Sequence, residues 1–307
     1  MFRIRDTVRA KLQISFAMRR REFLISAGAV PAILRGQTAL DVAYAGSMTS
    51  VMEGPIKQAA AGALGIEMRG RAQGASGLAA LIAGGSIHPD VFISVTPGPV
   101  ETVKKAGKVE RAFPIARTEM VIAYNPQSRF APQLKEGPWW RVLQQPGLRF
   151  GRTDPVTDPQ GRNIIFTVQL AAGYYHQPDL VNRILKDSIN PEQIFSEPSI
   201  QARLQSGQLD AASAYKIQPS AFHLPYLSLP EEINLGSPSR LQEYQHASLT
   251  VGGKTYHPEP LVYYAAALKE AAHPKEAARF VEWLRSAPAQ EILRQFSYDP
   301  PGDAHEL

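Results

Sequence analysis

Short apolar runs alternate with longer amphipathic runs along the chain from Leu40 onward, and this alternation predicts a series of strands and helices. In the first part of the chain the predicted strands are residues 40–46, 65–73 and 90–95, and the predicted helices are residues 47–63, 76–84 and 100–109, with a turn at Thr96–Pro99. Strands separated by helices in this way favour an α/β fold with parallel strands.

The second part of the chain continues this pattern with a less regular spacing. Further strands are predicted at residues 119–126, 209–216 and 261–268, and further helices at residues 138–147, 161–187 with a break at Pro178, 199–208 and 274–296 in two segments. No period of about 20 to 50 residues recurs, which excludes a solenoid. The 307 residues suffice for one large two-lobed unit or for two ordinary domains.

The formal net charge of +5 is unevenly distributed along the chain. Residues 1–39 hold eight of the 33 basic residues and two of the 28 acidic residues, which is a net charge of +6. The remainder therefore has 25 basic and 26 acidic residues, a net charge of −1. A nucleic-acid-binding surface needs basic residues within the folded part, so the hypothesis of a nucleic-acid partner loses its main support and we expect none.

Residues 1–39 have the layout of an export signal. A basic head at Met18–Glu22 precedes an apolar run at Phe23–Leu34 that is too short to span a membrane. Arg20-Arg21, one further residue and then Phe23-Leu24 fit a twin-arginine signal, with Met18 as an alternative start. We predict an export signal that is removed near Ala39. A basic amphipathic first helix is the alternative.

The absence of cysteine narrows the possible chemistry further. It excludes a disulfide framework, a thiolate metal site and a lipid anchor on an amino-terminal cysteine. The sequence after the leader has no run of about 18 apolar residues that could span a membrane. We therefore expect a soluble periplasmic or extracytoplasmic protein.

Three predicted strands end in small or hydroxyl-bearing residues immediately before a predicted helix. These segments are Gly46-Ser47, Gly74-Ala75-Ser76 and Thr153–Asp158. Ligands of open α/β sheets bind beyond the carboxyl ends of strands, and a helix amino terminus favours an anion there. The alternative is that each serine simply caps its helix. Several helix starts are expected to converge on one cleft.

Two further segments contain candidate ligand contacts. In Asp154–Asn163 the side chain of Asp158 is either a helix cap or a ligand residue, and the amides of Gln160 and Gly161 are expected to point into the cleft. Arg162 is either a source of positive charge or a surface residue. Tyr215, at the end of a predicted strand, is either a packing residue or a hydrogen-bond donor to the ligand.

Enzyme motifs are missing from the sequence. It contains neither a G-x-S-x-G, an H-E-x-x-H nor a P-loop pattern, and its seven histidines lack metal-ligand spacing. Trp139-Trp140 is either a stacking platform or part of the core. We predict a binding protein without a cofactor, a resident metal or an enzymatic activity.

Several motifs together resemble those of a known family. Five segments resemble motifs of the molybdate/tungstate-binding proteins of ABC transporters. These segments are AGS at Ala45–Ser47, EMVIAYNP at Glu119–Pro126, RFGRTDPVTDPQG at Arg149–Gly161, LDAASAYK at Leu209–Lys216 and LPEEINL at Leu229–Leu235. The resemblance covers residues from Leu40 to Phe296. It implies a type II periplasmic-binding-protein fold, in which two α/β lobes are joined by crossing hinge strands. The expected lobes are residues 40–120 with about 229–307, and residues 121–228.

The resemblance also implies the ligand residues. It implies that a tetrahedral oxyanion is held by Gly46, Ser47, Ser76, Tyr215 and the helix-start amides of Gln160 and Gly161. Asp158 would lie close to the central metal atom of the anion. The family has a glutamate immediately before the tyrosine, where this chain has Ala214. Loss of that carboxylate would leave a more neutral pocket, so we expect Ala214→Glu to shift preference toward molybdate and tungstate.

These observations predict an exported solute-binding protein of an ABC importer. It would be a monomer that captures molybdate or tungstate by hinge closure and delivers it to membrane permease and ATPase subunits. Sulfate, phosphate or another small anion is the alternative ligand. An enzyme that uses Asp158 as base and Tyr215 or Lys216 as acid on an anionic substrate is the alternative class.

Overall fold

The computed structural model describes residues 37–307, all of which belong to one compact unit. The predicted export signal lies outside the described residues except for its last three positions. The first strand begins at Thr38, so the predicted boundary near Ala39 falls inside a strand.

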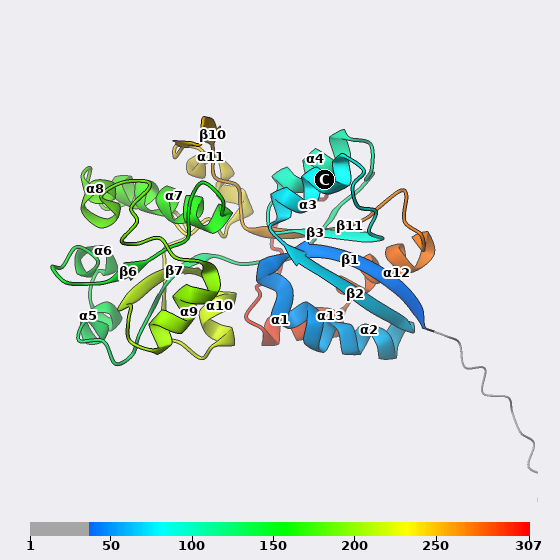
Figure 1. Ribbon diagram of the computed structural model, residues 1–307, viewed down its shortest axis with the longest axis horizontal. Helices are drawn as coiled ribbons and strands as arrows, with labels where there is room; N and C mark the ends of the chain where they lie inside the picture. The colour runs from blue at the N-terminus through cyan, green and yellow to red at the C-terminus, as the bar shows by residue number, and fades with distance from the viewer. Residues whose placement is uncertain (1–36) are drawn as a thin grey trace, which may run out of the picture. The chain divides into compact units, whose positions relative to one another are not determined.

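Segments from both ends of the described chain form a five-stranded mixed sheet (Figure 1). Its strands, in spatial order, are β2 (Ile66–Gln73), β1 (Thr38–Ala45), β3 (Val91–Ser94), β11 (Val262–Ala267) and β4 (Phe113–Arg117). Strand β1 is parallel to β2 and β3, whereas β11 is antiparallel to β3 and β4. The expectation of parallel strands is therefore right for the first three strands and wrong for the strand that returns from the end of the chain.

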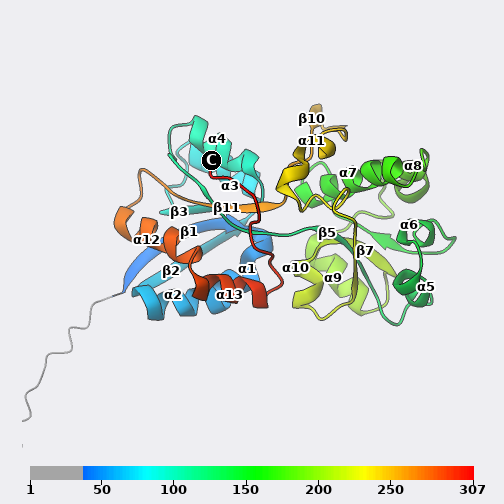
Figure 2. The ribbon, with the colours of Figure 1, turned by 180° about the vertical axis from the view of Figure 1, so that it is seen from behind.

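Helices cover both faces of this sheet (Figures 1 and 2). Helices α3 (Ala75–Ala83) and α4 (Pro97–Lys105) pack on one face, and α2 (Lys57–Leu64), α12 (Pro274–Leu284) and α13 (Ala287–Gln295) form a layer on the other. The expected turn at Thr96–Pro99 is wrong, because α4 already begins at Pro97. Proline suits the first helical turn, where its missing N–H has no partner to lose.

The predicted helix at residues 47–63 is broken into segments. It consists of η1 (Gly46–Met48), α1 (Thr49–Val51), a π-helical stretch η2 (Met52–Ile56) and α2. Gly54 has non-helical dihedral angles of φ −103° and ψ −107°, and Pro55 follows it. Proline removes a backbone donor from the helix interior, so the chain bends at this point.

The middle of the chain forms a second sheet of four strands. In spatial order these are β6 (Phe150–Gly151), β7 (Ala211–Tyr215), β5 (Met120–Tyr124) and β8 (Tyr226–Ser228). The helices of this segment are α5 (Ala131–Glu136), α6 (Trp139–Val142), α7 (Pro159–Tyr174), α8 (Leu180–Leu185), α9 (Glu197–Gln205) and α10 (Ile217–Ala221). Trp139 and Trp140 are buried against Tyr175, so these tryptophans belong to the core.

Two connections join the sheets. Thr118 and Glu119 link β4 directly to β5, and residues 229–261 return from β8 to β11. The return segment contains η3 (Pro238–Arg240), α11 (Leu241–Tyr244) and the hairpin of β9 (Leu249–Val251) and β10 (Lys254–Tyr256). Asn234 ties the two connections together, because its carbonyl oxygen accepts from the amide of Met120 at 2.8 Å and its side-chain Nδ2 donates to Glu119 at 2.9 Å.

Candidate ligand-binding site

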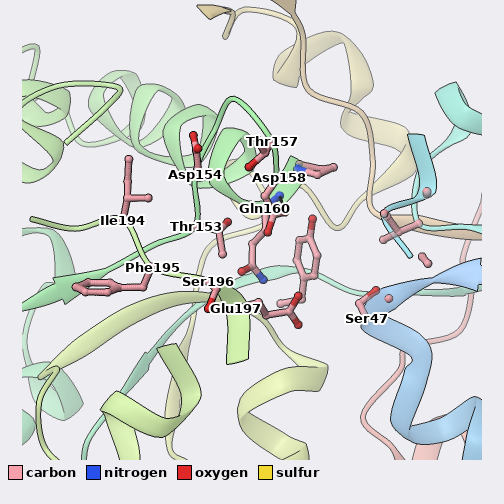
Figure 3. Close-up of a pocket in the computed structure, with 17 residues that line it drawn as sticks. Ser47, Thr153, Asp154, Thr157, Asp158, Gln160, Ile194, Phe195, Ser196 and Glu197 are labelled. Carbon is pink, nitrogen blue, oxygen red and sulfur yellow. Dashed lines mark hydrogen bonds between the residues drawn. The ribbon is translucent and has the colours of Figure 1, made fainter. Parts of the chain in front are cut away.

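A cavity of about 540 Å³ is lined by residues from the ends of strands in both sheets and from the loops that follow them (Figure 3). Its lining residues are Ala45, Gly46, Ser47, Gly74, Ala75, Val95, Thr153, Asp154, Thr157, Asp158, Pro159, Gln160, Ile194, Phe195, Ser196, Glu197 and Tyr215. All three predicted strand-end segments contribute to this list. The expectation that they meet at one site is confirmed for most of their residues.

Four helices begin at this cavity: η1 at Gly46, α3 at Ala75, α7 at Pro159 and α9 at Glu197. The first backbone N–H groups of a helix have no partner within the helix, and the helix dipole adds a partial positive charge there. Among these four starts, all within residues 37–307, only that of α7 has a side-chain cap. The wall of the cavity is therefore rich in donors suited to an anion.

Ser47 is held at the first of these helix starts by two tyrosines. Its Oγ lies 2.9 Å from Oη of the fully buried Tyr263 on β11, and Oη of Tyr298 donates to its carbonyl oxygen at 3.2 Å. The two tyrosine rings pack edge to face with centroids 5.3 Å apart. The carboxyl-terminal part of the chain thereby fixes a residue near the amino-terminal end of the described chain.

Tyr215, at the end of β7, lines the cavity. Asn163 Nδ2 donates to Tyr215 Oη at 3.0 Å, so the oxygen acts as an acceptor and the phenolic proton remains available to a ligand. Burial raises the pKa of Tyr215 well above its ordinary value, and the nearby charge of Asp158 adds to this effect. The hydroxyl is consequently a donor throughout the physiological pH range.

Asp158 is a helix cap that also lies at the cavity. It caps α7, because its Oδ1 accepts from the amide of Gln160 at 2.9 Å, and it also lines the cavity. Burial raises the pKa of this carboxyl above its usual range, although the bond from Gln160 opposes the shift. The backbone amide of Gln160 is therefore already occupied, while the residue still lines the cavity.

Gly161 does not reach the cavity, contrary to expectation. A Cβ at this position would lie 2.4 Å from the carbonyl oxygen of Thr153 and 2.7 Å from the carbonyl carbon of Asp154. The glycine is thus required for close packing of α7 against the 153–155 loop, and its role is structural.

Ser76 also lies outside this cavity. It is exposed and lines a neighbouring cavity of about 770 Å³, which shares Ala75, Val95 and Pro159 with the first. Arg162 lines this second cavity as well, with its guanidinium stacked 4.3 Å from the ring centroid of Tyr256. Neither side chain contributes to the site that holds Ser47 and Tyr215.

The position of Ala214 differs from the expectation that a carboxylate at residue 214 would face the ligand. It lies on the face of β7 opposite Tyr215, in a hydrophobic cluster with Val121, Ile200 and Leu204, and it is fully buried. The prediction that a glutamate here would reach the ligand is wrong for this chain, because alternate residues of a strand point to opposite faces.

Sequence reasoning missed Glu197, which lines the cavity, and Gln218, which supports three of the lining residues through hydrogen bonds. The carboxamide of Gln218 accepts from the amide of Tyr215 at 2.8 Å and from Gln160 Nε2 at 2.5 Å. Its Nε2 donates to Glu197 Oε1 at 2.5 Å. Gln218 lies three residues after Tyr215, which was the only local signal, and nothing in the sequence pattern indicated Glu197.

Of the residues in the alternative enzymatic arrangement, Asp158 and Tyr215 both line this cavity. Lys216 is paired with Asp299 and does not line the cavity that contains Asp158 and Tyr215. Across residues 37–307 no group of three or more histidine, aspartate or glutamate side chains is placed to hold a metal ion. No helix in this range is both long and apolar enough to cross a membrane.

Two sheets with helices on their faces and a donor-rich cavity at the strand ends define the type II fold of periplasmic binding proteins, and solved structures of that fold are similar to the chain. The periplasmic molybdate-binding protein of Azotobacter vinelandii is 17% identical with a TM-score of 0.56, covering 84% of this chain and 98% of its own. The sulfate-binding protein SubI of Mycobacterium tuberculosis is 13% identical with a TM-score of 0.58, covering 87% of this chain and 88% of its own.

The chain belongs to the family of bacterial extracellular solute-binding proteins, whose pattern matches residues 40–299. An uncharacterized solute-binding protein of Halobacterium salinarum is 29% identical over 279 residues, which cover 88% of this chain and 89% of the relative. The molybdate/tungstate-binding protein WtpA of Pyrococcus abyssi is 30% identical over 207 residues, which cover 60% of each chain. These relatives are solute-binding proteins and not enzymes.

Proposed function

We propose that this chain captures a tetrahedral oxyanion, with molybdate or tungstate as the preferred ligand, for an ABC importer. The observation that carries the proposal is the convergence of Ser47, Tyr215 and four helix starts on one cavity. A buried dianion is tolerated only when most of its oxygens accept hydrogen bonds, and this wall supplies such donors. The relative named for molybdate and tungstate supports the choice of metal oxyanion.

Capture would proceed by hinge closure. The cavity is much larger than a five-atom anion needs, so the segments that line it must approach each other to surround the ligand. The proposed lobes are residues 40–120 with about 229–307, and residues 121–228, which turn about the two connections between the sheets. The closed form would then dock on a membrane permease with its ATPase, and the chain would act outside the cytoplasm as a monomer.

Phosphate is the second candidate ligand, favoured by the carboxylates of Asp158 and Glu197 at the cavity. A protonated phosphate offers a donor to such an acceptor, whereas the other oxygens bind the helix starts. Sulfate lacks that proton, so the same observation disfavours it.

Calorimetric titration of the purified chain with molybdate, tungstate, phosphate and sulfate tests the proposal. We expect tight one-to-one binding of at least one of the first three anions. Tyr215→Phe removes the donated proton and should weaken that binding by roughly 10- to 100-fold, the effect of one hydrogen bond to a charged group. Tyr226→Phe, on β8 and outside the cavity lining, is the matched control and should bind like the wild type. Absence of binding to all four anions would refute the proposed function.

A further inference from the structure

Three carboxylates line the cavity, those of Asp154, Asp158 and Glu197, and the last two belong to the starts of different helices. Asp158 precedes α7, and Glu197 is the first residue of α9 (Figure 3). Both are partly buried, and their charges are close enough for Asp158 to raise the pKa of Glu197, in addition to the larger effect of burial. The cavity therefore contains a coupled pair of acidic groups, besides Asp154, although Ala214 faces the core.

Within the described residues, only one of the two carboxylate oxygens of Glu197 accepts a hydrogen bond. Gln218 Nε2 donates to its Oε1 at 2.5 Å, while within residues 37–307 its Oε2 accepts no hydrogen bond. Gln218 is itself fixed by Gln160 and by the amide of Tyr215. The second carboxylate oxygen is thus available to a ligand that also contacts Tyr215.

The charges of the residues that line the cavity determine how Oε2 of Glu197 affects a bound anion. Among the described residues that line it, none is a lysine, arginine or histidine. The anion would be held by neutral donors alone, against the three acidic groups Asp154, Asp158 and Glu197. A carboxylate beside an anion is repulsive unless the two share a proton or the carboxylate oxygen bonds to the central atom of the anion.

We propose that Glu197 is a specificity-determining residue, which together with Asp158 makes the cavity reject anions that carry no proton and whose central atom accepts no further oxygen ligand. The proposal rests on the proposed function. Sulfate at neutral pH is the simplest excluded anion. Molybdate and tungstate can bind beside these carboxylates because their metal centres can take additional oxygen ligands. Hydrogenphosphate can bind there because it carries a proton.

Glu197→Gln tests the proposal, because the amide keeps the shape of the side chain and can still accept from Gln218. Calorimetric titration with molybdate, inorganic phosphate and sulfate near neutral pH is expected to show sulfate affinity at least 10-fold higher than in the wild type. The ratio of molybdate to sulfate affinity should fall by at least 10-fold. Glu192→Gln, an exposed glutamate that precedes the same helix, is the matched control and should leave the ratio unchanged.

Glu197→Ala provides a second variant that removes the carboxylate without replacing it, and circular dichroism checks that each variant is folded. An unchanged molybdate-to-sulfate ratio in a folded Glu197 variant would overturn the proposal. Wild-type protein that binds none of these anions, or that binds a divalent cation instead, would refute the proposed function itself and is thus distinguishable.

Discussion

Ala214 and Tyr215 are neighbours in the sequence, yet one lies in a hydrophobic cluster and the other at the cavity. Every residue of β7 from Ala211 to Tyr215 is buried, so no alternation of apolar and polar residues reveals which face is which. A resemblance based on positions along the chain therefore agrees with the place of Tyr215 at the cavity but assigns the wrong surroundings to Ala214.

Ala214→Glu is expected to lower the free energy of unfolding by more than about 2 kcal/mol, because it buries an unpaired carboxyl among apolar side chains. Urea denaturation followed by circular dichroism measures this. Ala172→Glu, at a half-buried position of α7, is a milder comparison. A stable Ala214→Glu protein with altered anion selectivity would contradict the placement of this residue.

Among secondary-structure elements, β11 and the carboxyl-terminal segment support the helix start at Ser47. Tyr263 reaches this residue from β11, and Tyr298 does so from the chain that follows α13. Tyr264, the next residue of β11, is buried as well, but no hydrogen bond of its hydroxyl occurs within the described residues. Substitution of Tyr263 therefore tests the contact with Ser47, and substitution of Tyr264 is its matched control.

Tyr263→Phe removes the partner of the Ser47 hydroxyl and should weaken oxyanion binding by about 3- to 10-fold, the effect of a neutral hydrogen bond that orients a donor. Tyr264→Phe should leave the affinity unchanged. Both are measured by calorimetry. Equal effects of the two substitutions would show that Ser47 is not oriented through its contact with Tyr263.

The elements also show what the sequence could predict. Runs such as Val91–Ser94 and Val262–Ala267 are mostly buried and mostly apolar, which is typical of central strands, and both were predicted. The five-residue β4 contains Pro114 and Arg117 and was missed, because its pattern resembles a loop. Ser47, Asp158 and Tyr215 were predicted because they end strands or begin helices. Glu197 was missed because only tertiary packing brings it to the cavity, and Gln218 and Tyr263 were missed because only tertiary packing brings them to the lining residues Tyr215 and Ser47.

For the whole molecule, the pocket carboxyls link stability to pH. Burial raises the pKa of Glu197 above its ordinary value of 4.5. A group with a raised pKa in the folded state contributes stability that is fully present below the pKa of the unfolded chain and is lost as pH rises through the folded pKa. Wild-type protein without ligand should therefore lose stability relative to Glu197→Gln over that window.

Urea unfolding of both proteins at about pH 4 and about pH 8 tests this linkage. The free energy of unfolding of Glu197→Gln minus that of the wild type should be more positive at the higher pH. Comparing the two proteins cancels the many other carboxyls of the chain, several of which have lowered pKa values. A difference that does not change with pH would show that Glu197 titrates normally.

The helix starts around the cavity belong to the main chain, and a substitution of surrounding side chains does not remove them. Under the proposed function, ligand preference can therefore change through one or two exchanges at positions such as 158 and 197, while the main-chain attraction for anions persists. During evolution, a lineage could move from one nutrient anion to another without passing through an intermediate that binds nothing.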